Sequence, residues 1–416
     1  MIMTQTLEIA AGLDLHKKFI IATILFLAGG KMQERFERTH EGLLKLKDWI
    51  LDNKVQALGC ESTSDYAVQI YDMLNQYIPV IVGNARDIKA FTHKKTDKVD
   101  SEFIALLTLK GMIRPSRIFP KDLRNFRALT RLRHRLVEQR TTTKNYIHSI
   151  LDSELFLLSD AFTDIFGKSG RIVLNGITNG FTVDEILQCI PKNVKGKEVQ
   201  LRKIMEHTLS YYALKRMEAN LLILYAYDKQ IENITQLALD YAYTHHPREM
   251  KILKSVPGIG EIAAITILAE IGDIKDFPTP EQFASWLGIV PRVYQSADKL
   301  HTGSITKRGS VHARWILIQV AHAVGRSRNN SLKSFFQRKE PVIGKGKAVV
   351  ALARKIVVVI WHLLTNDEVY DDGIYKKSPQ PKHVSVKIPP IVTMEEILRI
   401  IQEAAIIIKK PDPGVI

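Results

Sequence analysis

Two long stretches with helical spacing of apolar residues constrain the fold of this chain more than any other feature. From Lys121 to Leu157, apolar residues recur every three or four positions on a basic background, and the stretch from Leu201 to Tyr243 repeats the pattern. Each such helix has an apolar stripe, which is buried most simply when the two helices pair. We therefore predict a long antiparallel coiled-coil arm, with residues 166–197 at its tip.

The first part of the chain alternates between strand-like and helical patterns. Strands are predicted at residues 7–13, 19–26, 31–38, 55–60 and 79–82, and helices at residues 41–51 and 66–77. Three meandering strands, followed by alternating helices and strands, are typical of an α/β layer built around a mixed sheet.

The remaining patterns divide the chain into four predicted parts. After residue 246 the sequence is helical with glycine and proline breaks, and after residue 365 it becomes a polar, proline-rich linker with one short helix at residues 394–409. The predicted parts are an α/β domain (1–118), the arm (119–246), a mostly helical domain (247–365) and the linker (366–416).

The charge distribution indicates a polyanionic partner. The formal net charge is +15. Residues 86–144 contain 16 basic and 6 acidic residues, and residues 292–355 contain 14 basic and 2 acidic ones. Two such zones favour two nucleic-acid contact surfaces, although two solvated helix faces would give the same pattern.

Other classes of protein fit this sequence poorly. The N-terminus lacks the pattern of a signal peptide, and no uncharged apolar run reaches the roughly 18 residues of a membrane span. The two cysteines, Cys60 and Cys189, are too few for a disulfide framework or a cysteine zinc site, and we expect both to be buried. A cytoplasmic protein without a membrane partner is therefore expected.

Four carboxylates form a candidate metal site. Asp14 and Glu61 each close a predicted strand, whereas Asp97 and Asp100 share one face at the start of a helix. Carboxylate oxygens suit Mg²⁺, and two such ions roughly 4 Å apart can stabilise the reacting oxygens of a phosphodiester. Taken singly, an aspartate at a strand end is more often a turn or capping residue.

Two motifs in the helical domain are candidates for DNA contact and chemistry. Gly258 and Gly260 bracket Ile259 between two predicted helices, as in a helix-hairpin-helix motif, whose backbone N–H groups can hold a phosphate. An ordinary glycine break between helices would look the same. Ser296 lies in a predicted polar loop rich in basic residues, where it could attack a phosphodiester or simply be solvated.

Basic residues beside these motifs, together with the two hairpin glycines, are the expected nucleic-acid contacts. They are Lys94, Lys95, Lys98, Arg124, Arg127, Arg131, Gly258, Gly260, Arg292, Lys299, Lys307 and Arg308.

The motif set as a whole resembles the DEDD transposase family, which includes Piv-type DNA invertases and bridge-RNA-guided recombinases of insertion sequences. The resemblance rests on GLDLHKK, CEST and KTDKVDSEFIA near the N-terminus, and on VPGIG, FASWLGIVPR, YQSADK and GSITKRG later in the chain. It covers roughly residues 7–365 and implies an N-terminal RNase H/RuvC-like domain, a coiled-coil region and a helical transposase domain.

The resemblance also implies a chemistry and partners. Asp14, Glu61, Asp97 and Asp100 would hold Mg²⁺, and Ser296 would attack DNA to form a covalent phosphoserine intermediate. The partners would be DNA at the element ends and the target, a structured guide RNA, and further copies of the chain in a dimer or tetramer. One residue departs from the family pattern, because Ala297 stands where a glycine commonly follows the serine.

Two alternatives remain open from the sequence. A RuvC-like, metal-dependent nuclease would cut DNA with water and use Ser296 only structurally. An architectural DNA-binding protein would retain the carboxylates without using them.

Overall fold

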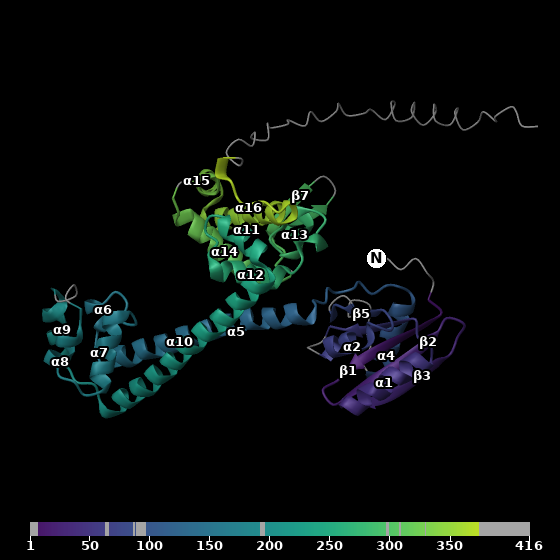
Figure 1. Cartoon of the computed structure of the whole chain (residues 1–416), viewed down its shortest axis with the longest axis horizontal. Helices are drawn as coiled ribbons and strands as arrows, with labels where there is room; N and C mark the ends of the chain where they lie inside the picture. The colour runs from purple at the N-terminus through teal and green to yellow at the C-terminus, as the bar shows by residue number, and fades with distance from the viewer. Residues whose placement is uncertain are drawn as a thin grey trace, which may run out of the picture. The chain divides into compact units, whose positions relative to one another are not determined.

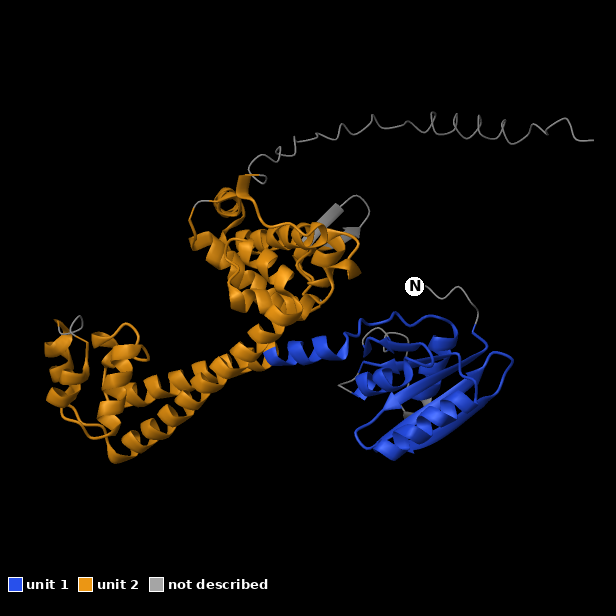
Figure 2. Cartoon of the chain, viewed as in Figure 1, with its two compact units in different colours: residues 1–129 blue, residues 130–416 orange. Residues whose placement is uncertain are grey.

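The computed structural model describes residues 7–62, 66–85, 88, 97–191, 196–296, 299–307, 309–328 and 330–373, with the backbone alone at 97–99 and 293–302. The chain divides into two compact units, residues 1–129 and 130–416, and the division falls inside helix α5 (Lys121–Ser153) (Figure 2). The first unit contains an α/β sheet and the second is mostly helical, as predicted.

The first unit is built on a five-stranded mixed sheet (Figure 1). Its strands, in the order β3-β2-β1-β4-β5, are β3 (Lys31–Glu37), β2 (Phe19–Phe26), β1 (Ile9–Leu15), β4 (Ala57–Glu61) and β5 (Val80–Gly83). The first three strands in the chain pair antiparallel, whereas β4 and β5 add in parallel beside β1. The predicted mixed sheet is confirmed, and this order is consistent with an RuvC-like domain.

Helices cover both faces of this sheet. On one face, α1 (His40–Asp52) and α2 (Tyr66–Leu74) bury Leu46, Ile50 and Ile70 against Leu13 and Leu58. The other face carries α4 (Asp97–Leu109). Because successive side chains of a strand point to opposite faces, the even-numbered residues of β1 and the odd-numbered residues of β4 face α4.

Helix α4 lies against the sheet at two glycines. A Cβ added at Gly12 would be 2.1 Å from the backbone nitrogen of Ala105, and one added at Gly59 would be 2.0 Å from Oγ1 of Thr108. Real Cβ atoms do not approach other atoms this closely. The glycines in AAGLD and ALGCE therefore allow the helix to pack directly on the backbones of β1 and β4.

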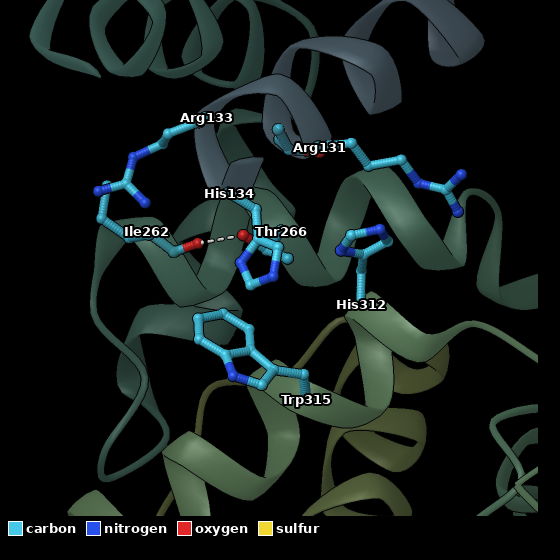
Figure 3. Close-up of a pocket in the computed structure, with 8 residues that line it drawn as sticks. Arg131, Arg133, His134, Ile262, Thr266, His312 and Trp315 are labelled. Carbon is cyan, nitrogen blue, oxygen red and sulfur yellow. Dashed lines mark hydrogen bonds between the residues drawn. The ribbon is translucent and has the colours of Figure 1, made fainter. Parts of the chain in front are cut away.

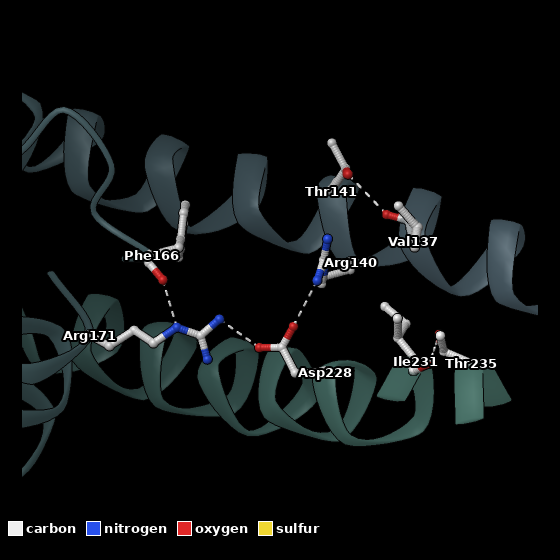
Figure 4. A network of polar contacts seen from close by, with 8 residues as sticks. All are labelled: Val137, Arg140, Thr141, Phe166, Arg171, Asp228, Ile231 and Thr235. Carbon is white, nitrogen blue, oxygen red and sulfur yellow. Dashed lines mark hydrogen bonds and ion pairs between the residues drawn. The ribbon is translucent and has the colours of Figure 1, made fainter. Parts of the chain in front are cut away.

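The second unit contains α10 (Tyr211–His245) and most of α5, the two long helices predicted from the sequence. In α10, the buried residues follow one stripe that includes Met217, Leu224 and Ile231. Arg133 of α5 donates to Thr235 of α10. Arg140 lies two turns after Arg133 in α5, and it contacts Asp228, which lies two turns before Thr235 in α10. The two helices therefore run side by side in opposite directions (Figure 4). Whether their side chains interlock as in a coiled coil stays a prediction.

The predicted single helix from Leu201 to Tyr243 is wrong at its start. The structure has α9 (Glu198–Met205), a break, and then α10. Ser210 ends the break, because its Oγ accepts from the backbone N–H of Ala213 and its own N–H and Oγ–H donate to Glu154. A capped serine thus begins a new helix where periodicity alone suggested continuity.

Short helices fill the segment between the two long ones. They are α6 (Leu158–Ala161), α7 (Lys168–Thr178), α8 (Val183–Cys189) and α9. They share one apolar core with the adjoining ends of α5 and α10, for example through Ile150, Val173 and Met217. The prediction about the cysteines is correct only for Cys60, whose burial raises the thiol pKa to about 12, because Cys189 is exposed.

The C-terminal part is a cluster of helices with one β-hairpin. Its elements are α11 (Pro247–Ser255), α12 (Glu261–Ile271), α13 (Pro280–Trp286), β6 (Pro291–Ser296), β7 (Lys299–Ile305), α14 (Val311–Arg326), α15 (Ser331–Ile343) and α16 (Lys345–Asn366). The polar loop predicted around Ser296 is wrong in part, since β-formers such as Val293, Tyr294 and Thr302 build paired strands there. The helix predicted at residues 394–409 lies outside the described residues.

Helix α16 is the central helix of this cluster. Among the described helices, α16 is the one long and apolar enough to cross a membrane. However, half of its most apolar stretch is buried inside the protein. Leu352, Ile356 and Ile360 pack in the interior, and Arg354 interrupts the apolar surface. A core helix in a globular protein has the same composition.

Candidate active site and nucleic-acid interface

Asp14 and Glu61 lie on neighbouring parallel strands. Leu13 and Cys60 are the last residues that β1 and β4 pair with each other, and Asp14 and Glu61 each follow by one residue. Asp14 follows Gly12, and Glu61 follows Gly59, by the two-residue period of a strand. Both carboxylates therefore lie at the carboxyl ends of adjacent strands, on the face that α4 covers.

Helix α4 brings its first turn toward the same edge. Its last residue, Leu109, packs with Ala10 and Ala57 near the beginning of the strands. One helical turn beyond the start of α4, the Ser101 hydroxyl lies 2.8 Å from that of Thr23, a residue paired with Gly12. The helix thus runs opposite to β1, and its beginning, with Asp97 and Asp100, is directed toward Asp14 and Glu61.

The electrostatics at this edge involve a histidine as well. The Nε2 atom of His16 lies 2.9 Å from Oδ2 of Asp14, and the two side chains are 30% and 21% exposed. Among the side chains that the structure describes, which exclude that of Asp97, no three His, Cys, Asp or Glu groups lie close enough to hold a metal. Carboxylate oxygens are nevertheless the ligands that Mg²⁺ prefers in proteins, so the residue types at this edge fit a divalent cation.

Ser296 stands at the turn end of the β6–β7 hairpin. It is the last residue of β6 and pairs with Lys299, the first residue of β7. Ala297, at which this chain departs from the family pattern, lies outside the described residues. The hairpin places the backbone of Ser296 at its outer end, and the opposite end forms its root.

The root of this hairpin is firmly held. The backbone N–H of Thr306 donates to Val290, and that of Lys307 to Gly288. Gly309 has a φ of +91°, and a Cβ added there would lie 1.9 Å from the carbonyl oxygen of Trp286. Only glycine tolerates both the backbone angle and the close approach, so the chain after β7 is fixed against α13.

The glycine turn predicted from the sequence lies between two helices, α11 and α12. Gly258 has a φ of +84°, and a Cβ added there would lie 2.8 Å from Cγ2 of Val324 in α14. Gly260 is the N-cap of α12, no side chain caps the helix, and no heavy atom lies within 4 Å of the position of an added Cβ. Gly258 is therefore needed for packing, whereas Gly260 leaves space beside the N–H groups at the start of the helix.

The basic residues predicted to contact nucleic acid differ in the contacts that they make within the protein. Arg124 hydrogen bonds to Asp72 and to the carbonyl oxygen of Phe119, and Arg127 lies 4.7 Å from the centre of the Phe119 ring. Arg131 forms two hydrogen bonds to Glu270. Arg292 lies 3.5 Å from the carbonyl oxygen of Thr306.

The other predicted contacts are only partly described. Lys307 has a positive φ of 55° at the hairpin root, and Lys98 and Lys299 are placed by their backbone. Lys94, Lys95 and Arg308 lie outside the described residues.

Within the second basic zone, the structure places a cluster whose residues the sequence analysis did not name. Residues 311–366 contain 10 basic residues and 1 acidic residue. Lys355 of α16 and Lys339 of α15 lie 4.7 and 6.0 Å from the ring centre of Phe335. Burial, and then the charge of Arg338, lower the pKa of Lys355. We call Phe335, Arg338, Lys339 and Lys355 the α15–α16 basic cluster. In the sequence, this cluster is indicated by the excess of basic over acidic residues in the two helices.

Comparison with known proteins matches two segments of the chain to models of transposases. Residues 11–155 match the model of an IS110-type DEDD transposase domain, described as "Transposase", and residues 250–337 match that of the "Transposase IS116/IS110/IS902 family". The first match covers the strands and helix that carry the carboxylates, and the second covers the glycine turn and the serine hairpin. The chain belongs to the IS110 family of transposases. The resemblance drawn from the motifs is thus confirmed, and the enzyme class is DNA transposase or recombinase.

Individual relatives agree with this family. The chain is 26% identical to the transposase for insertion sequence element IS1111A of Coxiella burnetii, over 71% of this chain and 74% of the relative. It is 27% identical to the transposase for insertion sequence element IS1328 of Yersinia enterocolitica, over 66% and 73%. It is also 28% identical to the pilin gene-inverting protein of Moraxella bovis, over 30% and 39%.

Proposed function

We propose that this IS110-family member cuts and rejoins DNA through a covalent bond between Ser296 and a DNA phosphate. The observation that carries the proposal is the placement of Asp14, Glu61 and the start of α4 at one edge of the sheet. A carboxylate cluster in a transposase domain suits phosphodiester chemistry, and the second matched segment supplies a serine on an anchored hairpin.

The covalent step conserves the phosphodiester bond. The hydroxyl oxygen of Ser296 bonds to phosphorus, the bond from phosphorus to one sugar oxygen breaks, and that oxygen leaves with a proton. In the reverse direction a sugar hydroxyl of another DNA end displaces the serine and joins the strands. No external energy source is needed, because each step exchanges one phosphoester for another.

Asp14, Glu61, Asp97 and Asp100 are the residues that would hold Mg²⁺. When bound, the ion would neutralise charge on the phosphate oxygens. These carboxylates would hold the ion, and other residues of the chain would orient the phosphate and keep the DNA backbone near the site. Two basic zones also support an RNA partner, and we propose a structured guide RNA and a homo-oligomer on the strength of the family.

The first experiment looks for the covalent intermediate. Wild-type protein is incubated with Mg²⁺, its copurifying RNA and labelled DNA from the ends of its own element, and the products are separated on a denaturing gel. A labelled band that migrates with the protein and disappears after protease digestion supports the proposal. Cut DNA without such a band would instead favour the metal-dependent nuclease that uses water.

Replacement of Asp14 by asparagine tests the carboxylate site. The amide keeps the shape but loses the negative charge, so we expect strand cleavage to fall by more than about 100-fold, as when one charge-stabilising group is lost. DNA binding, measured separately, should change little. Asp48→Asn on the exposed surface of α1 is the matched control and should cut at the wild-type rate. Wild-type cleavage by Asp14→Asn would contradict the assignment.

The α15–α16 basic cluster is proposed as a contact for the DNA backbone. Each lysine or arginine that neutralises a phosphate releases condensed counterions, so log K falls with log[salt] by about 0.9 per contact. In the double variant Arg338→Gln/Lys339→Gln, we expect weaker DNA binding and a salt slope smaller by about 2. Lys215→Gln, on the exposed face of α10, should leave the slope unchanged. An unchanged slope in the double variant would exclude this surface.

A further inference from the structure

A buried carboxylate in the helical cluster joins three elements that lie far apart in the sequence. Glu270 of α12 is 0% exposed. The Nε and Nη2 atoms of Arg131, on α5, donate to its two oxygens at 2.7 and 3.1 Å. The hydroxyl of Ser310, which stands just before α14, donates to the same carboxylate at 2.7 Å.

This arrangement is costly if its only role is stability. Glu270 lies in a helix whose buried residues are otherwise alanine, isoleucine and leucine. Removing a carboxylate from water is energetically unfavourable, and an apolar residue of similar volume is often equally stabilising or more so. An apolar residue cannot make directional hydrogen bonds. The carboxylate of Glu270 makes two with a guanidinium and one with a hydroxyl, and together they fix the relative orientation of three elements.

Ser310 connects this contact to the hairpin that carries Ser296. It follows Gly309, the residue held against Trp286, and it is the N-cap of α14. Its hydroxyl oxygen accepts from the backbone N–H of Ala313 while its proton is donated to Glu270. The hydroxyl thus both donates and accepts a hydrogen bond, and the start of α14, shortly after β7 ends at Ile305, is fixed to α12.

Helix α5 contacts the same part of α14 at a second place (Figure 3). The ring of His134 packs against those of Trp315 and His312, with centres 4.4 and 5.1 Å apart. Burial, and then the positive charge of Arg131, lower the pKa of His312, which favours a neutral ring at this contact. Two contacts on one face of α5, at Arg131 and His134, therefore set the position of α14 relative to the long helix.

We propose that Glu270 is a positioning residue that, with Arg131 and Ser310, couples helix α5 to the root of the β6–β7 hairpin and so holds Ser296 in place for reaction. This inference rests on the proposed role of Ser296. Glu270 is inaccessible and cannot touch DNA, so its effect passes through Ser310 and Gly309. Arg131 acts in this linkage rather than as a direct nucleic-acid contact.

The test compares Glu270→Gln with a matched variant elsewhere in the same unit. Glutamine keeps the size of the side chain but loses the charge that pairs with Arg131. We expect the rate of adduct formation at saturating DNA to fall on the order of 10- to 100-fold, the effect of a misplaced reacting group. The dissociation constant for DNA should stay within about twofold, since DNA contacts are retained. Ser310→Ala should likewise lower the rate of adduct formation without changing the dissociation constant for DNA, and Ser310→Thr should restore the rate.

The matched control is Asp228→Asn, which removes a carboxylate that bridges Arg140 and Arg171 at 3.0 and 2.6 Å (Figure 4). It also breaks a charged contact of α5, but none that involves the hairpin root. We expect it to lower thermal stability without lowering the rate of adduct formation. Equal rate losses in Asp228→Asn and Glu270→Gln would show that Glu270 is merely structural and would overturn the proposal.

Amide hydrogen exchange separates this proposal from the proposed function. Exchange at residues 303–310 should accelerate in Glu270→Gln and not in Asp228→Asn, whether or not wild-type protein forms an adduct. Faster exchange without any adduct in the wild type would retain the coupling and reject the serine chemistry. Unchanged exchange in Glu270→Gln would reject the coupling itself.

Discussion

Replacement of Ser296 by alanine is expected to abolish the protein–DNA adduct and, with it, strand joining. The methyl group offers no oxygen to bond to phosphorus, and loss of an enzymatic nucleophile lowers the rate by more than about 10⁴-fold. DNA affinity should be retained, because the basic surfaces and the glycine turn are unchanged. The measurement is the denaturing-gel assay, together with DNA binding by the same preparation.

A second serine on the same hairpin provides the control. Ser304 is an exposed residue of β7, so Ser304→Ala changes the same atoms without touching the proposed nucleophile. It should form the adduct at the wild-type rate. If Ser296→Ala still released cut DNA at the wild-type rate, the serine would be structural, and cleavage by water would become the better account.

The sheet and its carboxylates could be predicted because their signals are local. Runs such as residues 19–26 are apolar and β-branched over the length of a strand, and small residues in β1 and β4 precede Asp14 and Glu61. The carboxyl ends of adjacent parallel strands meet at one edge, so the sequence was sufficient to bring these two residues together. The close packing of α4 depends on Gly12 and Gly59, whose role is visible only once the strand pairing is known.

The contacts around Glu270 could not be predicted, because they join residues that lie far apart in the sequence. Glu270 and Arg131 are 139 residues apart in the sequence, and each has an ordinary local context, one at the end of an apolar helix and the other in a basic helix. The available hint was an acidic residue following the apolar run AAITILA. A partner at that distance depends on how α5 packs on α12, which periodicity does not specify. The β6–β7 hairpin was missed because its β-formers, such as Val293 and Tyr294, stand among polar and basic residues, so the segment lacks the continuous apolar run of residues 19–26.

Replacement of Gly12 by alanine is expected to disrupt the α/β unit. The added Cβ would stand 2.1 Å from the nitrogen of Ala105 and 2.3 Å from the carbonyl oxygen of Ser101, both backbone atoms that cannot rotate away. Overpacking typically costs about 1–3 kcal/mol, and a clash with helix backbone belongs at or above the upper end of that range. Since domains are stable by only about 5–15 kcal/mol, a clear shift of the urea unfolding midpoint should follow.

The same substitution links packing to the active site. Helix α4 carries Asp97 and Asp100, so a helix forced away from β1 also moves these carboxylates from Asp14 and Glu61. Gly12→Ala should therefore lose cleavage even under conditions in which it remains folded. Gly346→Ala in α16 is the control, because no heavy atom lies within 4 Å of its added Cβ and alanine favours a helix by up to about 1 kcal/mol. A Gly12→Ala variant as stable and active as the wild type would show that α4 does not rest on this strand, and the proposed carboxylate site would then lose its geometric basis.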